Sequence, residues 1–384
     1  MASILSYVPV VNRFINSNDV SRSIDIPPVE VHNVETAPEK RPRTLKHLLR
    51  ANHVNHSIIY HDLRFHNHMP HILCSAYLLG ASDAHLRDVY DEEAKVLDPW
   101  EPSPAEVTQD DWRTYLGDRR YQRAFVDFFE DSLAMRHNYN WKKVAEEYLF
   151  GGKEPMVNCL IGGLGHPLIH LGYAFEMDNK EIGMESLGLA ATEYNFFHKF
   201  MDDPSYTRPS PLKSLSPLEL LTQMSNDQRV RELFKEPGFQ NLGTLFEDHE
   251  DLVMEYWNAW SLDNPKKQFQ KSQEAAVSLL VATVPPRNTF IQLLCCPSSH
   301  DKPCLYAIFK CPKIDPDYVK PTDVNGKQWD YVENKALTGA YSTDAHFVKA
   351  VRAIKEASRT WGDVHEHYLA SAVRFVDDFE GWVY

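Results

Sequence analysis

Residues 156–175 read MVNCLIGGLGHPLIHLGYAF, an apolar stretch in which glycines recur and two histidines stand four residues apart. The apolar content and the small residues predict a buried pair of closely packed helices. His166 and His170 fall on one face of such a helix because residues four apart are neighbours on its surface. A buried imidazole needs a partner, since its desolvation is otherwise uncompensated. The stretch therefore predicts a helical core in which the two histidines are either hydrogen-bonded structural residues or part of a functional site.

Outward from this stretch the chain keeps a helical pattern. Residues 181–200 predict a long amphipathic helix, Pro70 is placed where a helix can begin, and Ser82 can cap the next one. Period-two alternation with β-branched residues is nearly absent, and no repeat or dividing linker is found. We therefore expect a mainly α fold, with an extended arm over residues 1–43 and a single large helical domain over residues 44–384.

The composition excludes some classes of function. The formal net charge of the 384 residues is −14, which disfavours nucleic acid and anionic membranes as partners. No apolar run is long enough to span a bilayer, and the first residues make a poor secretion signal. The six cysteines form no CxxC pair, which is typical of free thiols in a reducing compartment. We expect a cytoplasmic protein.

Histidine is the unusual feature of the composition, with 18 residues in the chain. Residues 65–71 read FHNHMPH, and His68 and His71 are three apart where a helix beginning near Met69 would start. Both side chains can then point to one side of the first helical turn and chelate a metal such as Fe or Zn. An exposed polar loop with incidental histidines is the alternative.

A third motif, DAHFVKAVR over residues 344–352, places His346 and Lys349 on one helical face after Asp344. A lysine in this position normally extends its ammonium to solvent. Burial would instead lower its pKa and leave a neutral nucleophilic amine. Such an amine can take up carbon dioxide to form a carbamate, an anionic oxygen ligand.

Other residues are candidates for supporting roles, and several competing motifs are missing. The chain has no HExxH, ExxH, GxSxG or Walker A motif, and the third glycine of a dinucleotide fingerprint is replaced by Leu168. His365 and His367 are two apart and are interpreted as surface residues. Carboxylates that could orient the imidazoles are Glu176, Glu185 and Glu193. Aromatic residues that could line a pocket for a flat polycycle, or simply belong to the core, are Phe65, Tyr77, Tyr173, Tyr194 and Phe197.

Together, FHNHMPH followed by ILCSAYLLGAS, then GHPLIHLGYAFE, then DAHFVKAVRA resemble the questin-oxidase-like family, in the family's order and over about residues 45–360. The resemblance implies a helical enzyme that uses molecular oxygen to open anthraquinone rings. In one branch the metal is a non-haem Fe(II) held by four histidines and a carboxylated lysine. Carried over to this chain, the ligands are His68, His71, His166, His170 and Lys349, with His346 as a sixth candidate.

The resemblance leaves two enzyme hypotheses and one from another class. The first is an Fe(II)-dependent dioxygenase that cleaves a ring of an anthraquinone-like aromatic polyketide in secondary metabolism, with Lys349, His346 and Asp344 as catalytic candidates. The second is a Baeyer–Villiger-type monooxygenase that requires NADPH. The third is a catalytically silent helical protein that binds a small molecule. For the enzyme readings the partners are the aromatic polyketide and O2, without nucleic acid or membrane.

Overall fold

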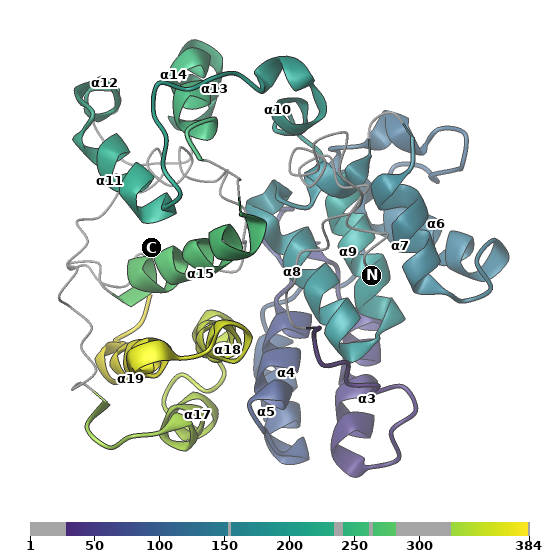
Figure 1. The fold of residues 1–384 in the computed structure, drawn as a ribbon. Helices are drawn as coiled ribbons and strands as arrows, with labels where there is room; N and C mark the ends of the chain where they lie inside the picture. The colour runs from purple at the N-terminus through teal and green to yellow at the C-terminus, as the bar shows by residue number, and fades with distance from the viewer. Residues whose placement is uncertain (1–27, 153–154, 234–240, 261–263, 282–323, 383–384) are drawn as a thin grey trace. The chain divides into compact units, whose positions relative to one another are not determined.

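The computed structural model describes residues 28–152, 155–233, 241–260, 264–281 and 324–382. These residues are helical over most of their length (Figure 1), with a single small pair of strands among them. The predicted mainly α class is confirmed. None of the described helices is long and apolar enough to cross a membrane.

The described residues group into two compact units. Unit 1 holds residues 28–202 and 333–352, and unit 2 holds the described parts of residues 203–332 together with 353–382. The single domain that we expect over residues 44–384 stays a prediction. In the predicted arm, residues 28–39 contain neither helix nor strand, and the first helix of the described residues begins at Lys40, inside the predicted arm.

Unit 1 is built around helix α9 (Lys180–Thr192), in which every residue from Glu181 onward is buried. Helix α9 packs against α3, α6, α7 and α8. Two of its glycines make this close packing possible. A Cβ at Gly183 would lie 2.8 Å from the Trp141 ring, and a Cβ at Gly188 would lie 2.8 Å from Val126. The other helices and short helical turns of unit 1 are α3 (Lys40–Asn55), α4 (Met69–Leu78), α5 (Asp83–Glu93), η1 (Trp112–Tyr115), η2 (Arg119–Tyr121), α6 (Gln122–Met135), α7 (Trp141–Phe150), η3 (Met156–Cys159), α8 (Gly162–Met177) and α10 (His198–Asp202).

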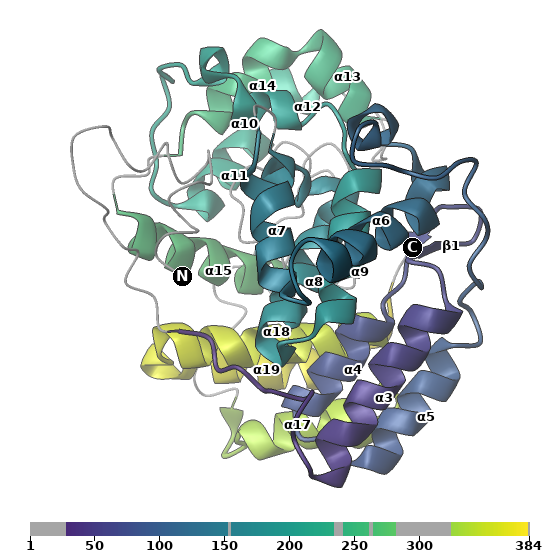
Figure 2. The same cartoon turned by 90° about the vertical axis from the view of Figure 1, so that its right-hand side faces the viewer.

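Helices α3, α4 and α5 lie side by side in Figures 1 and 2, and α4 also contacts α8. Pro70 is the second residue of α4, and the Ser82 side chain accepts a hydrogen bond from the His85 N–H to cap α5, as predicted. Such a cap contributes about 1 kcal/mol. Before α4, strand β1 (Ile59–Tyr60) pairs antiparallel with β2 (Phe65–His66).

The predicted helix over residues 181–200 is wrong in its second half. Helix α9 ends at Thr192, and α10 begins only at His198. The amphipathic pattern continues through this break, but the side chain of Glu193 bonds to His66 and Arg119 instead of extending a helical surface. Tertiary bonds to one carboxylate have overridden the local pattern.

Unit 2 is also helical. The apolar pattern between residues 218 and 260 also predicts short helices, and helices are present there with shifted ends. The sequence further predicts a helix over residues 288–294 and a proline-rich surface excursion over residues 302–331; the first and most of the second lie outside the described residues. Two helices, α17 (Trp329–Thr338) and α18 (Ala345–Trp361), contribute to both units. The remaining helices and turns of unit 2 are η4 (Pro204–Tyr206), α11 (Pro217–Asn226), α12 (Gln228–Arg231), α13 (Asn241–Asp248), α14 (Glu250–Trp257), α15 (Pro265–Val281), η8 (Val364–Glu366) and α19 (His367–Asp378).

Candidate metal centre

Three segments of unit 1 bring five imidazoles and one amine into a buried cluster. The start of α4 supplies His68 and His71, α8 supplies His166 and His170, and the first turns of α18 supply His346 and Lys349. We call these six residues the histidine cluster. They are the six metal candidates that the sequence indicated, so three distant motifs meet as expected. Their role as ligands stays a prediction.

The imidazoles of the histidine cluster touch one another. The His68 ring centroid lies 4.9 Å from that of His166 and 4.5 Å from that of His346. The His71 ring lies 4.5 Å from the ring of His170 and 5.3 Å from the ring of His68. His71 and His170 are 0% exposed, and Lys349 is 3% exposed. Lys349 therefore does not extend its amine to solvent as surface lysines do.

The start of α8 has an unusual backbone that places His166 in the cluster. Gly163, Leu164 and Gly165 have φ angles of 53°, 57° and 77°, in the left-handed region, before the regular helix begins. Pro167 follows in the first regular turn, where its missing N–H costs little. The left-handed turn brings the Gly163 carbonyl within 2.5 Å of Nδ1 of His166. The glycine-rich sequence thus sets the direction of one imidazole.

Gly163→Ala is expected to damage this arrangement. The backbone is left-handed at this position, and a Cβ would lie 2.7 Å from Nε2 of His66. Strain of this kind costs about 1–2 kcal/mol before any clash is counted, so we expect a lower free energy of unfolding in urea titrations. Gly172→Ala on the same helix is the matched control, because nothing lies within 4 Å of a Cβ there. That control should be neutral or slightly stabilising. Equal losses of unfolding free energy in both variants would contradict a specific need for glycine at position 163.

Hydrogen bonds fix which ring nitrogens can act as bases. A carbonyl oxygen can only accept, so Nδ1 of His166 donates to the Gly163 carbonyl and its Nε2 carries a lone pair. That Nε2 faces Nε2 of His68 at 2.9 Å. Nε2 of His71 lies 2.8 Å from Nδ1 of His170, and Nδ1 of His170 lies 3.2 Å from the His166 carbonyl oxygen. The arrangement of His166 is the one that second-layer carbonyls commonly impose on metal-binding histidines.

All five imidazoles are neutral at physiological pH. Burial lowers the pKa of His68, His71, His166 and His346 well below its usual value, and the nearby charge of Lys349 lowers each further. Burial likewise lowers the pKa of His170 to about 3. Neutral imidazoles are Lewis bases, so the cluster offers unprotonated nitrogens over the physiological pH range.

The depressed pKa values predict that acid destabilises the metal-free protein. Below about pH 6.5 each of these histidines takes up a proton in the unfolded chain but not in the folded one. The unfolded state then binds more protons, so the free energy of unfolding falls as the pH falls. Each imidazole contributes a slope of about 1.4 kcal/mol per pH unit. Urea titrations between about pH 7 and 5 in chelator measure that slope.

One variant isolates a single imidazole. His71→Asn should show a slope that is smaller by one histidine's share, because the unfolded chain has lost one proton acceptor. His47→Ala, on the exposed face of α3, is the control and should keep the parent slope. An unchanged slope in His71→Asn would contradict a neutral His71 in the folded protein.

His66 forms a supporting layer behind His166. Its ring stacks on that of His166 with centroids 4.1 Å apart, and its Nε2 is 2.9 Å from Oε1 of Glu193. Arg119 donates to the other oxygen of Glu193 at 2.8 Å, and through a second nitrogen to the Leu63 carbonyl. The sequence indicated Glu193 as a supporting carboxylate but gave no role to His66. The two-residue spacing of His66 and His68 was the available signal, since residues two apart share a face in extended chain.

His53 forms a second supporting layer, behind His170. Its Nδ1 is 2.9 Å from Oε1 of Glu185, and its Nε2 is 2.8 Å from Oε1 of Glu130. Burial opposes protonation of His53, but the hydrogen bonds that it donates to the two carboxylates prevail and raise its pKa to about 10. Oε2 of Glu185 lies 3.8 Å from Nε2 of His170. No spacing in the sequence linked His53, more than a hundred residues away, to this carboxylate.

The remaining polar candidates have other partners. Glu176 pairs with Arg352. Asp344 accepts a hydrogen bond from the Phe347 N–H at 2.7 Å and so caps α18.

Glu93 is a further carboxylate near this end of α18 that the sequence did not indicate. Burial and the charge of Asp344 raise the pKa of Glu93 to about 7, although the charge of Lys349 acts to lower it. His367 is half-buried, and the side chain of His365 lies outside the described part.

The five aromatic candidates divide by position. Phe65 is 54% exposed on the strand pair, so it does not belong to the core. Tyr173 lies beside the cluster, with its ring 5.7 Å from that of His71 and its hydroxyl 2.6 Å from Oγ of Ser75. Tyr77 packs under Arg41, Tyr194 bonds to His198, and Phe197 packs on Phe196.

The donor set of the histidine cluster fits a cation that prefers nitrogen ligands, such as ferrous iron. Nδ1 of His71 and Nε2 of His170 are buried without a hydrogen-bond partner. Yet among the described residues no group of three or more His, Cys, Asp or Glu side chains is arranged to hold a metal ion. The imidazoles hydrogen-bond to one another instead, and these bonds must open before a metal can bind.

Comparison with known proteins finds relatives that are named as oxidases. The chain is 30% identical over 215 residues to the Baeyer–Villiger oxidase AgnL3 of Paecilomyces divaricatus, and the aligned region covers 52% of this chain and 45% of that protein. It is 28% identical over 208 residues to the questin oxidase of Aspergillus fumigatus, covering 51% and 46%. A third relative, the Baeyer–Villiger oxidase mdpL of Emericella nidulans, is 29% identical over 170 residues, covering 42% and 38%. The matches span about half the length of these relatives or less.

The family comparison includes two of the three motifs. The model of the Questin oxidase-like family matches residues 65–300, which contain the α4 and α8 histidines but not His346 and Lys349. The matched residues make up more than half of the chain, and the chain belongs to the questin oxidase-like family.

Proposed function

We propose that the chain is an oxygenase that cleaves a ring of an anthraquinone-like aromatic polyketide, with the histidine cluster as the reaction centre. The observation that carries the proposal is the meeting of four buried imidazoles, the half-buried imidazole of His346 and one buried amine from three distant segments. So many buried titratable groups with shifted pKa values are characteristic of functional sites. The names of the relatives supply the class of reaction.

The finer proposal is that the cluster holds Fe(II) through His68, His71, His166 and His170, with Lys349 carboxylated and His346 beside them. When bound, iron would supply an open coordination position and the redox chemistry that activates O2. The protein's own contribution is orientation. The Gly163 carbonyl sets His166, the ring of His66 supports it from behind, and Glu185 lies beside His170. The buried setting excludes water from the reacting groups.

Metal analysis and oxygen uptake test the proposal together. Protein produced with added iron is analysed for bound metals, and oxygen consumption is followed with an anthraquinone such as questin. Near-stoichiometric iron that is lost in His68→Ala, with oxygen uptake that needs no other reductant, is the expected result. Oxygen uptake by fully metal-free protein would end the iron proposal and leave the oxygenase proposal standing.

The second candidate function is a Baeyer–Villiger-type monooxygenase that uses NADPH. The names of the relatives favour it, because several are Baeyer–Villiger oxidases or monooxygenases. A monooxygenase places one oxygen atom in the product and needs two electrons to reduce the other to water. Oxygen uptake that starts only when NADPH is added, with one NADPH consumed per turnover, would select this function over the first.

A further inference from the structure

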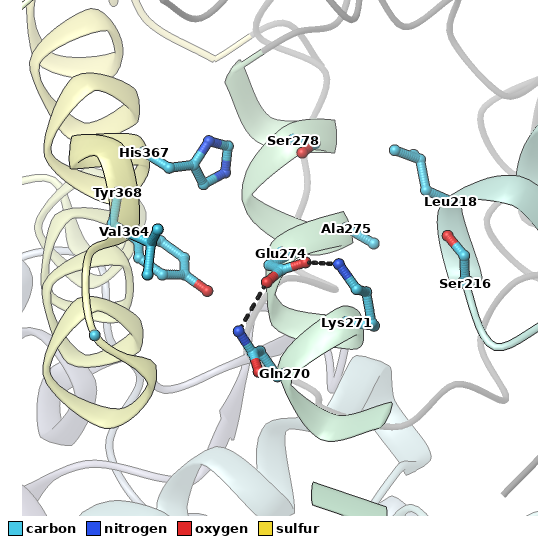
Figure 3. A pocket seen from close by; sticks show the side chains of 11 residues that line it. Ser216, Leu218, Gln270, Lys271, Glu274, Ala275, Ser278, Val364, His367 and Tyr368 are labelled. Atoms are coloured by element: carbon cyan, nitrogen blue, oxygen red, sulfur yellow. Dashed lines mark hydrogen bonds and ion pairs between the residues drawn. The ribbon is translucent and has the colours of Figure 1, made fainter. Parts of the chain in front are cut away.

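Unit 2 contains a pocket that the proposed oxygenase site does not use. Its volume is about 280 Å³, near the lower end of the range for small-molecule sites. Helix α15 forms one wall of the pocket. The first turn of α19, with Gly362 and Val364 before it, forms a second wall, and the start of α11 forms a third (Figure 3). All the lining residues belong to unit 2.

Tyr368, in the first turn of α19, supplies the unusual group of this pocket. The residue is 3% exposed, and its hydroxyl is buried without a hydrogen-bond partner. Its backbone is well anchored, because the Tyr368 N–H donates to Oδ1 of Asp363 at 2.7 Å. In Figure 3 the hydroxyl is directed toward Gln270 and Glu274 of α15. A buried hydroxyl without a partner is costly and needs an explanation.

The facing side chains of α15 form a neutral polar group. Glu274 accepts a hydrogen bond from Nε2 of Gln270 at 3.0 Å and pairs with Nζ of Lys271 at 2.6 Å. The ion pair cancels the formal charge, and each carboxylate oxygen can accept a further hydrogen bond. Burial, and then the charge of Glu274, raise the pKa of Tyr368, so its phenol stays protonated and can donate. The Tyr368 phenol can thus act as a donor, and the ion-paired Glu274 as an acceptor, in the pocket.

Apolar side chains complete the wall. Leu218, Ala275 and Val364 line the pocket together with the polar residues. A ligand that matches this lining has an apolar body and a hydroxyl group, and it carries no charge. The volume limits that body to about one ring, because sites for drug-sized ligands begin at roughly 300 Å³.

We propose that this pocket binds a small uncharged ring compound bearing hydroxyl groups, with Tyr368 and Glu274 as its hydrogen-bond partners. The ligand hydroxyl accepts from Tyr368 and donates to Glu274, which satisfies the buried phenol. The proposal goes beyond the oxygenase function and does not depend on it, since no residue of the histidine cluster takes part.

Calorimetric titration of the full chain with resorcinol tests the proposal, with toluene and benzoate as comparison ligands. Resorcinol is expected to bind with a Kd of about 1 mM or below, as its few atoms permit, and more tightly than either comparison ligand. Tyr368→Phe keeps the ring and should weaken resorcinol binding about tenfold while leaving toluene unaffected. The melting temperature of ligand-free Tyr368→Phe should equal or exceed that of the parent, because no hydrogen bond within the protein is lost.

Tyr139→Phe, at an exposed tyrosine of unit 1, is the matched control and should change neither value. Absence of resorcinol binding, or equal binding by Tyr368→Phe, would overturn the proposal. Tighter binding of benzoate would overturn the uncharged class of ligand. A clearly lower melting temperature of Tyr368→Phe would show that the hydroxyl has a structural partner, which also overturns it. Bound metal and oxygen uptake measured on the same variants report on the histidine cluster alone.

Discussion

His166→Ala is expected to abolish metal binding and to lower turnover at least about a thousand-fold, which corresponds to roughly 4 kcal/mol of transition-state stabilisation. His166 occupies the middle of the histidine cluster. Its Nε2 lies 2.9 Å from Nε2 of His68, and its ring is stacked between those of His66 and His71, with centroid distances of 4.1 and 5.7 Å. Removing this imidazole deletes one proposed ligand and the contact that aligns its neighbours. Bound iron and oxygen uptake measure the effect.

A second substitution separates chemistry from folding. His166→Gln keeps a polar side chain of similar length, so the variant should remain folded by circular dichroism while metal and turnover are still lost. His47→Ala, on an exposed position of α3, should keep both. If His166→Ala retains stoichiometric iron and parental turnover, the histidine cluster is a hydrogen-bonded core and the site must be sought elsewhere.

Much of the fold could be predicted because its signals are local. Ser82 caps α5, Pro70 opens α4, and the glycine-rich residues around 162–172 mark the close-packed α8. The break after Thr192 could not be predicted, because it depends on bonds from Glu193 to residues more than seventy positions earlier. The left-handed turn at Leu164 is similar in kind, since a leucine with positive φ has no sequence signal of its own.

In the candidate site, too, local patterns could be predicted from the sequence and long-range contacts could not. Helical spacing paired His68 with His71 and His166 with His170 within each segment. Only the resemblance to a family suggested that these segments meet each other and α18. The supporting residues His53 and Arg119 carry no such pattern, because a side chain that acts through another residue need only reach it in space. Their roles follow from the bonds to Glu185 and Glu193.

Lys349→Ala is the second substitution with a large expected effect. As an ammonium, Lys349 lowers the pKa of the surrounding histidines, and it would repel a divalent cation in the same low-dielectric cluster. Reaction of the neutral amine with carbon dioxide gives a carbamate and releases a proton, so the local charge changes from positive to negative. We therefore expect Lys349→Ala to lose metal and about a thousand-fold in turnover.

Chemical rescue distinguishes a carbamate from a lysine needed for another reason. Short carboxylates such as propionate fit the space that alanine leaves and supply an anionic oxygen, so they should restore part of the metal content and turnover of Lys349→Ala. Lys349→Arg is the matched control, because arginine keeps the positive charge but cannot be carboxylated and fills the space. It should be inactive with or without propionate. Full iron and turnover in Lys349→Ala would remove the carbamate, and full activity in Lys349→Arg would show that the cation itself is required. Because the parent enzyme would lose its carbamate when carbon dioxide is depleted, its metal content should also fall on removal of bicarbonate and recover when bicarbonate is returned.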